Sequence, residues 1–343
     1  MIAMRKAPLK SKATLVDVAR EAGVGPMTVS RTINGHPYVS KETAKRVKAA
    51  IRKLGYRPNV AARMLTGQTS RSIGLIVPDV ADPFFSVVSR AVQQAAREAG
   101  YTVWLAVSDG DQVTEKAELE EMTNHPVDGI VLAPVNSLAR HLTEAAKGSI
   151  PIVTIDRPIE SASTDSVEVE SRVGSHMAVE HLRKHRYKKI ACIAMNFHLR
   201  SIKLRVSAYE EYMRKEKLPV TKVLIEPDED VLPTLKALFK SRQRPDALFV
   251  ANNVCAIAVI KALQTLDIRV HEDVALVVFD DVDFYTLLSP SITAIRQPVA
   301  EVGRTGTNLL LDRIRGGGAS SNVRVVLPVE LVVRESCGCK MPQ

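Results

Sequence analysis

Short, almost continuously apolar runs recur along the chain from Ser72 onward, and helix-compatible stretches separate them. The first four are SIGLIVPD, YTVWLAVSD, VDGIVLAPV and IPIVTIDR, with helical stretches such as 85–99 and 114–124 between them. Strands that are apolar along their whole length need cover on both faces, which is typical of parallel sheets built from βαβ units. The alternation resumes with KKIACIAMN, DALFVANN and VALVVFDD. We therefore predict an α/β protein with two doubly wound parallel sheets and a cleft between them.

The carboxyl ends of these predicted strands are polar. Ligands of open α/β sheets bind outside those ends. The residues found there are Asp79, Asp82, Asp109, Asp156, Arg157, Asn252, Asn253, Asp280 and Asp281. Any one of them is typical of an ordinary turn, but together the carboxylates and amides suit the hydroxyl groups of a ligand. Phe84 or Phe85 could cover the apolar face of a sugar.

The segment before residue 73 differs from the rest in charge. It holds 15 Lys+Arg and 3 Asp+Glu, a balance of +12, whereas the remainder holds 32 basic and 35 acidic residues. A solvated basic tail would lack helical periodicity, and this segment has it. We therefore predict a small domain that binds a polyanion.

Three short helices fit this basic segment. Thr14 is followed at capping-box spacing by an aspartate, and apolar residues then recur at helical spacing until Gly23. Pro26 suits the first position of a second helix, because its missing N–H would have no partner there. A third helix is predicted between Ser40 and Gly55. Two helices joined at a glycine-containing turn predict a helix-turn-helix.

The second of these helices is predicted to read DNA, because its polar face and N-terminal end are free to enter a major groove. Arg31 can reach guanine O6 and N7 or a phosphate. Thr28, Ser30 and Asn34 suit backbone oxygens, and Met27 stands on the same side. A three-helix bundle that binds nothing is the alternative, and the +12 balance argues against it.

The segment NVAARMLTGQTSRS follows the helix-turn-helix. Its helix-compatible part, between Asn59 and Thr66, is too short to be stably helical alone in water. One interpretation is a plain linker. The other is a segment that folds on DNA and inserts an apolar wedge, best Leu65, into a minor-groove step. The residues alone do not decide between them.

Other classes of function lack their signatures. No apolar run suits a signal peptide or a membrane helix, so we expect a cytoplasmic protein with no membrane partner. This expectation, with the basic segment, argues against a secreted sugar-binding protein. No GxSxG, P-loop or HExxH motif occurs, so we expect no enzyme and no cofactor.

The cysteines and a group of histidines are further candidate sites. The cysteines are Cys192, Cys255, Cys337 and Cys339. They are too few and too unevenly placed for a disulfide framework. The CGCK near the end could bind metal or form a redox pair, but we favour a frayed terminal segment. His176, His181 and His185 are interpreted as solvated side chains of a basic helix, and no metal site is predicted.

The stretches TLVDVAREAGVGPMTVSRTING, YVSKETAKRV, LGYRPNVAARML and SIGLIVPD, in this order and spacing, resemble the lactose-repressor (LacI/GalR) family of bacterial transcription regulators. The resemblance runs from Thr14 to Ser336. It implies a DNA-binding domain at 1–58, a hinge helix and linker at 59–71, and a two-lobed body at 72–343 similar to periplasmic sugar-binding proteins. The implied lobes are about 72–169 with 299–326, and about 170–297 with 327–339, so that the chain crosses between them three times.

The resemblance also implies site residues. The residues implied to bind DNA are Thr14, Pro26, Met27, Thr28, Ser30, Arg31, Asn34, Tyr38, Asn59, Ala62, Arg63 and Leu65. The residues implied to bind an effector are Asp82, Phe84, Phe85, Asp156, Arg157, Glu170, Arg205, Asn252, Asp280 and Gln297. For Leu65 the resemblance favours the wedge over the linker.

The implied activity is repression by a homodimer on a pseudo-palindromic operator of double-stranded DNA, controlled by a carbohydrate-like small molecule. Two positions of the second helix differ from typical members. Pro26 and Met27 stand where polar or aromatic residues usually contact bases. They leave fewer hydrogen bonds to bases, so we expect more reliance on Arg31 and on DNA shape.

Overall fold

The structure is a computed structural model that describes residues 13–33, 38–56, 69–125, 127–226, 229–317 and 321–339. The chain divides into two compact units, residues 1–70 and residues 71–343. In the described ranges no helix has the length and apolar character needed to cross a membrane.

The first unit contains the three predicted helices, α1 (Leu15–Ala22), α2 (Pro26–Ile33) and α3 (Lys41–Leu54). The predicted capping box is present, since Thr14 and Asp17 satisfy each other's backbone N–H groups. The chain turns after α1 at Gly23, whose φ of 62° lies in the left-handed region that favours glycine. Val18, Val29 and Val47, one from each helix, are fully buried and form the centre of the small core.

Arg46 of α3 holds the turn between the first two helices. Its Nη2 donates to the carbonyl oxygens of Ala22 at 2.6 Å and Gly23 at 3.0 Å. These carbonyls end α1 and have no partner within the helix. One of the cations counted in the basic segment is therefore committed to the fold.

The second unit holds two six-stranded sheets, as predicted. The sheet of the N-lobe has the strand order β11-β5-β4-β3-β1-β2, and all its neighbours are parallel. Its strands are β1 (Ser72–Val77), β2 (Thr102–Val107), β3 (Ile130–Leu132), β4 (Ile152–Ile155), β5 (Asp165–Val169) and β11 (Arg324–Leu327). Its helices are α5 (Pro83–Glu98), α6 (Gln112–Asn124), α7 (Arg140–Ala145) and α12 (Val299–Ile314).

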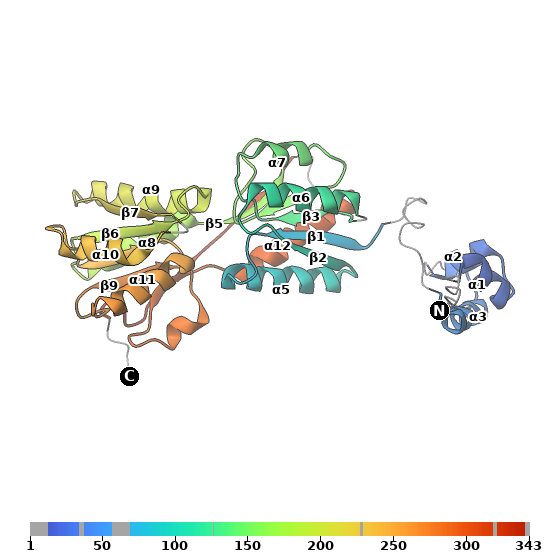
Figure 1. Ribbon diagram of the computed structural model, residues 1–343. Coiled ribbons are helices and arrows are strands. Elements are labelled where there is room, and N and C mark those ends of the chain that lie inside the picture. The colour runs from blue at the N-terminus through green and yellow to red at the C-terminus, as the bar shows by residue number, and fades with distance from the viewer. Residues whose placement is uncertain are drawn as a thin grey trace, which may run out of the picture. The chain divides into compact units, whose positions relative to one another are not determined.

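Helices cover both faces of this sheet (Figure 1). Alternate residues of β1 point to opposite faces: Ile73 and Leu75 pack with α5 and α12, and Ile76 packs with α6 and α7. One prediction fails at the edge. The strand β2 is predicted to be buried, but Trp104 and Leu105 are exposed, because β2 is an edge strand and has β1 as its one neighbour among the described strands.

The sheet of the C-lobe has the order β12-β10-β9-β8-β6-β7. Its strands are β6 (Ile190–Met195), β7 (Thr221–Ile225), β8 (Ala247–Val250), β9 (Ala275–Phe279), β10 (Thr293–Arg296) and β12 (Glu330–Val332). Its helices are α8 (Ser171–Lys184), α9 (Arg200–Lys215), α10 (Val231–Lys240), α11 (Asn253–Thr265) and the short η1 (Asp283–Thr286). The edge strand β12 runs antiparallel to β10, so the expectation of a wholly parallel sheet is wrong at this strand.

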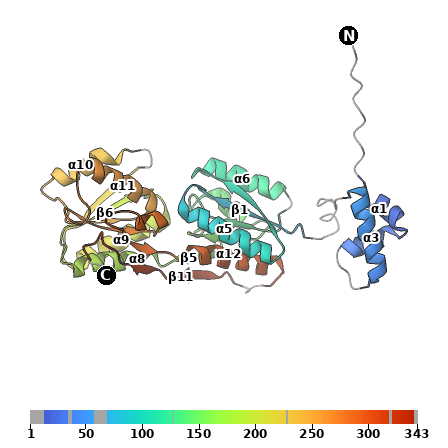
Figure 2. The same ribbon diagram turned by 90° about the horizontal axis from the view of Figure 1, so that it is seen from below.

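The C-lobe repeats the layered arrangement, with α10 and α11 on one side of the sheet and α8 and α9 on the other (Figure 2). Each face of the sheet has its own hydrophobic core. Successive residues of a strand belong to different cores, as Ile193 packs in one and Cys192 in the other. The chain passes between the lobes three times: from β5 to α8, from β10 to α12, and from β11 to β12.

A close approach of α12 to α5 in the N-lobe gives a stability prediction. A Cβ added at Gly303 of α12 would lie 2.8 Å from the carbonyl oxygen of Val88 and 3.0 Å from the Cβ of Ala91, both on α5. A backbone atom cannot move aside as a flexible side chain can. Gly303→Val should therefore lower the free energy of unfolding by about 2 to 3 kcal/mol, measured by urea denaturation.

The matched control is Asn308→Val, because Asn308 is exposed on the same helix. Its change should stay within about 0.5 kcal/mol. Equal losses in both variants would show that the effect comes from valine in a helix and not from the α5–α12 contact.

Candidate functional site

The outer face of α2 is the first candidate. Val29 and Thr32 turn inward, whereas Pro26, Met27 and Arg31 are exposed. Thr28 and Ser30 are half-buried beside them, so this face carries one cation and two hydroxyl groups. The structure thus places on one surface five of the residues predicted to contact DNA.

The remaining predicted DNA contacts are placed differently or not at all. Tyr38 is 86% exposed in the connection that leads to α3. The hydroxyl of Thr14 is used in the cap of α1, where it donates to Asp17 at 2.7 Å. The other five lie outside the described residues, and the hinge and its wedge stay predictions: Asn34, Asn59, Ala62, Arg63 and Leu65.

The second candidate is a cavity of about 480 Å³ in the unit of residues 71–343. It lies at the carboxyl ends of strands from both sheets, where the topology places ligands of open α/β folds. Nine of the ten predicted effector residues line it: Asp82, Phe84, Phe85, Asp156, Arg157, Arg205, Asn252, Asp280 and Gln297. Its volume is ordinary for a small-molecule site.

Glu170 is the exception. It occupies the N-cap position of α8, where its side chain makes no capping bond, and it is not among the residues around the cavity. The position follows β5 at the first crossing between lobes, whereas the cavity is built from strand ends farther inside each sheet. The structure does not support this part of the predicted site.

A hydrogen bond joins the two lobes across the cavity. Asn253 Nδ2, at the start of α11, donates to Asp82 Oδ1 at 2.8 Å. The same carboxylate oxygen caps α5 by accepting from the N–H of Phe84 at 2.9 Å. Burial raises the pKa of Asp82, and the bonds from Asn253 and Phe84 oppose that rise. The Asp82 carboxylate therefore contacts both the N-terminus of α5 in the N-lobe and Asn253 of the C-lobe.

Asp280 is the polar centre of the C-lobe side. It accepts hydrogen bonds from Arg205 Nη1 at 3.4 Å, from the N–H of Asn253 at 3.2 Å, and from Gln297 Nε2. Arg205 in turn donates to the carbonyl of Ala251 at 2.9 Å. The predicted residues from α9 and from the ends of β9 and β10 thus form one connected network.

Two guanidinium groups in the cavity have N–H donors for which no described residue supplies an acceptor. Arg157 is 3% exposed and pairs with Asp156 at 2.9 Å, but no described residue accepts from its Nε or Nη1. Arg205 is equally buried and stacks 3.7 Å from the centre of the Phe279 ring, and its Nε also finds no acceptor among the described residues. Buried donors of this kind are costly unless a ligand or water satisfies them.

Four residues beside the cavity share an uncommon backbone conformation with a positive φ. Asp109, Asp156, Asn196 and Asp280 all have φ between 52° and 80°, although none is glycine. Aspartate and asparagine tolerate this left-handed region better than most residues, at a cost of about 1 to 3 kcal/mol each. Such residues cluster at functional sites, where they aim a side chain or leave room for a ligand.

Several residues of the cavity were not assigned to it from the sequence. Asn196, His198 and Ser201 come from the end of β6 and the start of α9. The rule that picked the other strand ends would have found Asn196, because it directly follows the apolar run KKIACIAMN. Burial, and then the charge of Arg157, lower the pKa of His198, so its neutral ring offers one donor and one acceptor.

A larger hollow of about 870 Å³ shares Phe84, Asp280 and Gln297 with this cavity. Asp281, a carboxylate that lines the hollow but not the cavity, is already paired, with Arg334 at 2.8 and 2.9 Å and with Arg296 at 2.9 Å. Burial raises the pKa of Asp281, but these partners outweigh it and hold that pKa below its usual range. The smaller cavity, with its unpartnered donors, is therefore the better candidate for a ligand.

Comparison with known protein families agrees with the two units. Residues 14–59 match a family described as "Bacterial regulatory proteins, lacI family", and residues 179–337 match one described as "Periplasmic binding protein-like domain".

Named relatives extend over nearly the whole chain. The HTH-type transcriptional repressor PurR of Photobacterium profundum is 30% identical over 330 residues, covering 94% of this chain and 98% of its own length. The HTH-type transcriptional regulator PtxS of Pseudomonas aeruginosa is 32% identical, covering 96% and 97%. The ribose operon repressor of Halalkalibacterium halodurans is 31% identical, covering 94% and 96%.

Solved structures share the fold of this chain. The lac repressor dimer bound to operator and the anti-inducer ONPF superposes with a TM-score of 0.83 at 25% identity, covering 95% of this chain and 99% of that one. The complex of the transcriptional regulator CelR with cellobiose has a TM-score of 0.70 at 29% identity, covering 94% and 99%.

Proposed function

Because the chain belongs to the LacI family of bacterial regulatory proteins, we propose that it is a transcriptional repressor whose affinity for its operator is set by a neutral sugar bound in the cavity of residues 71–343. The family and the class, a DNA-binding repressor and not an enzyme, are the premise. The chemistry of the effector is the proposal.

One observation carries the choice of ligand: the cavity offers fixed donors and fixed acceptors side by side. Arg157 and Arg205 only donate, and the carboxylates of Asp82 and Asp280, when ionised, only accept. A ligand that satisfies both kinds must itself donate and accept at neighbouring atoms, which sugar hydroxyl groups do. The T-shaped pair of Phe84 and Phe85, with ring centroids 5.0 Å apart, supplies an apolar wall for the carbon face of the ring.

The charge balance of the cavity favours a neutral sugar over a phosphorylated one. Five carboxylates and two guanidinium groups line it: Asp79, Asp82, Asp109, Asp156, Asp280, Arg157 and Arg205. An added phosphate would meet an excess of like charge in a buried site. Among the compared proteins, CelR was solved in complex with cellobiose, a neutral sugar, and the repressor of Halalkalibacterium halodurans is named for a ribose operon.

On DNA, we propose that two chains present their α2 helices to the half-sites of a pseudo-palindromic operator. Arg31 is the exposed cation on α2, so it would supply the guanine or phosphate contact, while Thr28 and Ser30 would fix the register. Sugar binding would change the arrangement of the lobes through the Asn253–Asp82 bond and so alter operator affinity.

A thermal-shift panel tests the ligand class. The full chain is heated with D-ribose, other aldopentoses, hexoses, cellobiose and the 5- or 6-phosphates of the monosaccharides. We expect at least one neutral sugar to raise the Tm in a concentration-dependent way, because a ligand that binds only the folded state stabilises it. Each phosphate should give a smaller shift than its parent sugar. Larger shifts with the phosphates would refute the proposed ligand class.

A further inference from the structure

The C-terminal turn of the C-lobe is ordered, contrary to the expectation of a frayed segment. Cys337 is fully buried and Cys339 is half-buried. The expectation failed because it rested on distance from the chain end alone. The turn is instead fixed by long-range bonds: Ser336 Oγ donates to the carbonyl of Leu276 at 2.7 Å, and Thr293 N–H donates to Ser336 Oγ at 2.8 Å.

Gly338 lets this turn bring Cys339 back toward the lobe. Its φ is 88°, and a Cβ there would lie 2.9 Å from the hydroxyl of Tyr187. That hydroxyl donates to the carbonyl of Cys337 at 3.4 Å, so the turn is attached to the end of α8 as well as to the sheet. The position of the Cys339 thiol is therefore set by the fold.

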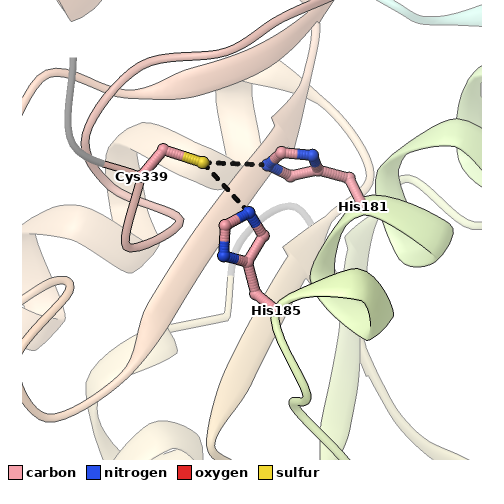
Figure 3. Close-up of side chains that lie close together, drawn as sticks. All are labelled: His181, His185 and Cys339. Carbon is pink, nitrogen blue, oxygen red and sulfur yellow. Dashed lines mark hydrogen bonds between the residues drawn. The ribbon is translucent and has the colours of Figure 1, made fainter. Parts of the chain in front are cut away.

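Two imidazole rings from α8 meet this thiol (Figure 3). Cys339 Sγ lies 3.0 Å from His185 Nε2 and 3.7 Å from His181 Nε2, and all three atoms lie within 4.8 Å of one another. The two histidines are four residues apart, which places them one turn apart on the same helix face. Their interpretation as simply solvated helix-surface residues omits the sulfur that the end of the chain brings to them.

The spacing of these atoms suits a tetrahedral metal ion. Zinc binds thiolate sulfur at about 2.3 Å and imidazole nitrogen at about 2.0 to 2.1 Å, so two ligand atoms of a tetrahedral site lie about 3.5 Å apart. The observed S···N separations of 3.0 and 3.7 Å bracket that value. A thiolate with two neutral imidazoles is a soft to borderline ligand set, which favours Zn²⁺ over Mg²⁺ or Ca²⁺.

We propose that His181, His185 and Cys339 form a Zn²⁺ site that fastens the C-terminal turn to α8. The ion is bound by the Nε2 atoms of the neutral histidines and by Cys339 as a thiolate, whose proton passes to solvent. The fourth position is left to water. The Cys337 thiol lies beside this site: it interacts with His181 and Cys339 and also accepts from Thr293 Oγ1 at 3.2 Å.

The test uses Co²⁺ in place of Zn²⁺ because the absorption spectrum of bound Co²⁺ depends on its ligands. The full chain is reduced, freed of metal and titrated with Co²⁺. We expect about one equivalent to bind, with a sulfur-to-cobalt charge-transfer band and the visible bands of a tetrahedral ion, and Zn²⁺ should abolish both. Zn²⁺ should also raise the Tm of the unmodified chain.

Three variants make the assignment specific. Cys339→Ser should remove the charge-transfer band, and His185→Gln should weaken Co²⁺ binding by about tenfold or more. Cys339 and His185 are each accessible enough that neither change leaves a large cavity, and circular dichroism checks the fold. His125→Gln is the matched control, because His125 is an exposed histidine of the N-lobe that pairs with Glu121 and packs against the Trp104 ring, far from any cysteine ligand of the proposed site.

The proposal fails if the reduced chain shows no charge-transfer band, or if the band survives in Cys339→Ser. It also fails if His125→Gln weakens binding as much as His185→Gln does. Isolation of Cys337 and Cys339 as an intramolecular disulfide from cells grown with zinc would contradict it too, because an oxidised sulfur does not serve as the thiolate ligand.

Discussion

Arg205→Ala is expected to lower the affinity for the stabilising sugar by about a hundredfold, the ordinary result of removing one partner from a buried charge pair. Arg205 is 3% exposed and contacts Asp280, so its loss leaves that carboxylate buried without its cation. The variant also removes the Nε–H that no described residue accepts, which we assign to a ligand hydroxyl. Isothermal titration with the best neutral sugar of the panel measures the effect.

The control for this prediction lies on the same helix. Arg214 of α9 pairs with Glu210 at the surface, and its side chain is 66% exposed. Arg214→Ala removes the same charge and should leave sugar affinity unchanged, since exposed ion pairs contribute little. Operator binding without sugar should persist in both variants. Unaltered sugar affinity in Arg205→Ala would mean that the ligand binds elsewhere.

Arg31→Ala is expected to cost about 1 to 3 kcal/mol of operator affinity, which is about 5- to 150-fold. Arg31 is the cation on the exposed face of α2, and the neighbouring Pro26 and Met27 provide no side-chain hydrogen bonds to bases. A titration by fluorescence anisotropy with an operator selected from random DNA measures this loss. Binding to random duplex should fall less, because it rests on many phosphate contacts.

Lys53→Ala is the control that separates the loss of a base contact from the loss of one positive charge. Lys53 stands in the last turn of α3 and pairs with Glu21 at 2.7 Å, so its removal changes the net charge by the same amount as the loss of Arg31. We expect it to weaken specific and random binding by similar small factors. If Arg31→Ala behaved in the same way, α2 would have no reading role.

The architecture was accessible from the sequence because its signals are local. Each apolar run predicts a buried strand, and each predicted strand of the second unit is present. The strand-end rule also predicts that Asp82, Asp156, Asn252 and Asp280 lie together, and all four line the same cavity. The helix-turn-helix was equally local, as Gly23 and Pro26 mark the end of one helix and the start of the next.

The errors arose where a partner is distant in sequence. Arg46 was counted with the basic residues, yet it caps α1 from another helix. Cys339 was assigned to a frayed end, although it meets His185 across 154 residues. The direction of β12 could not be read from its composition, since parallel and antiparallel edges carry similar residues. Arg205 lies within a helix, so no strand-end rule selects it, and only the family resemblance did.

The central claim is that one small molecule and one operator influence each other through this chain. Operator affinity is measured for the full chain with and without a saturating concentration of the best neutral sugar, and sugar affinity is measured with and without operator. We predict that operator affinity changes by about 5- to 150-fold, a coupling of about 1 to 3 kcal/mol, and that sugar affinity changes by the same factor. A sugar that binds the cavity yet leaves operator affinity the same would contradict the account.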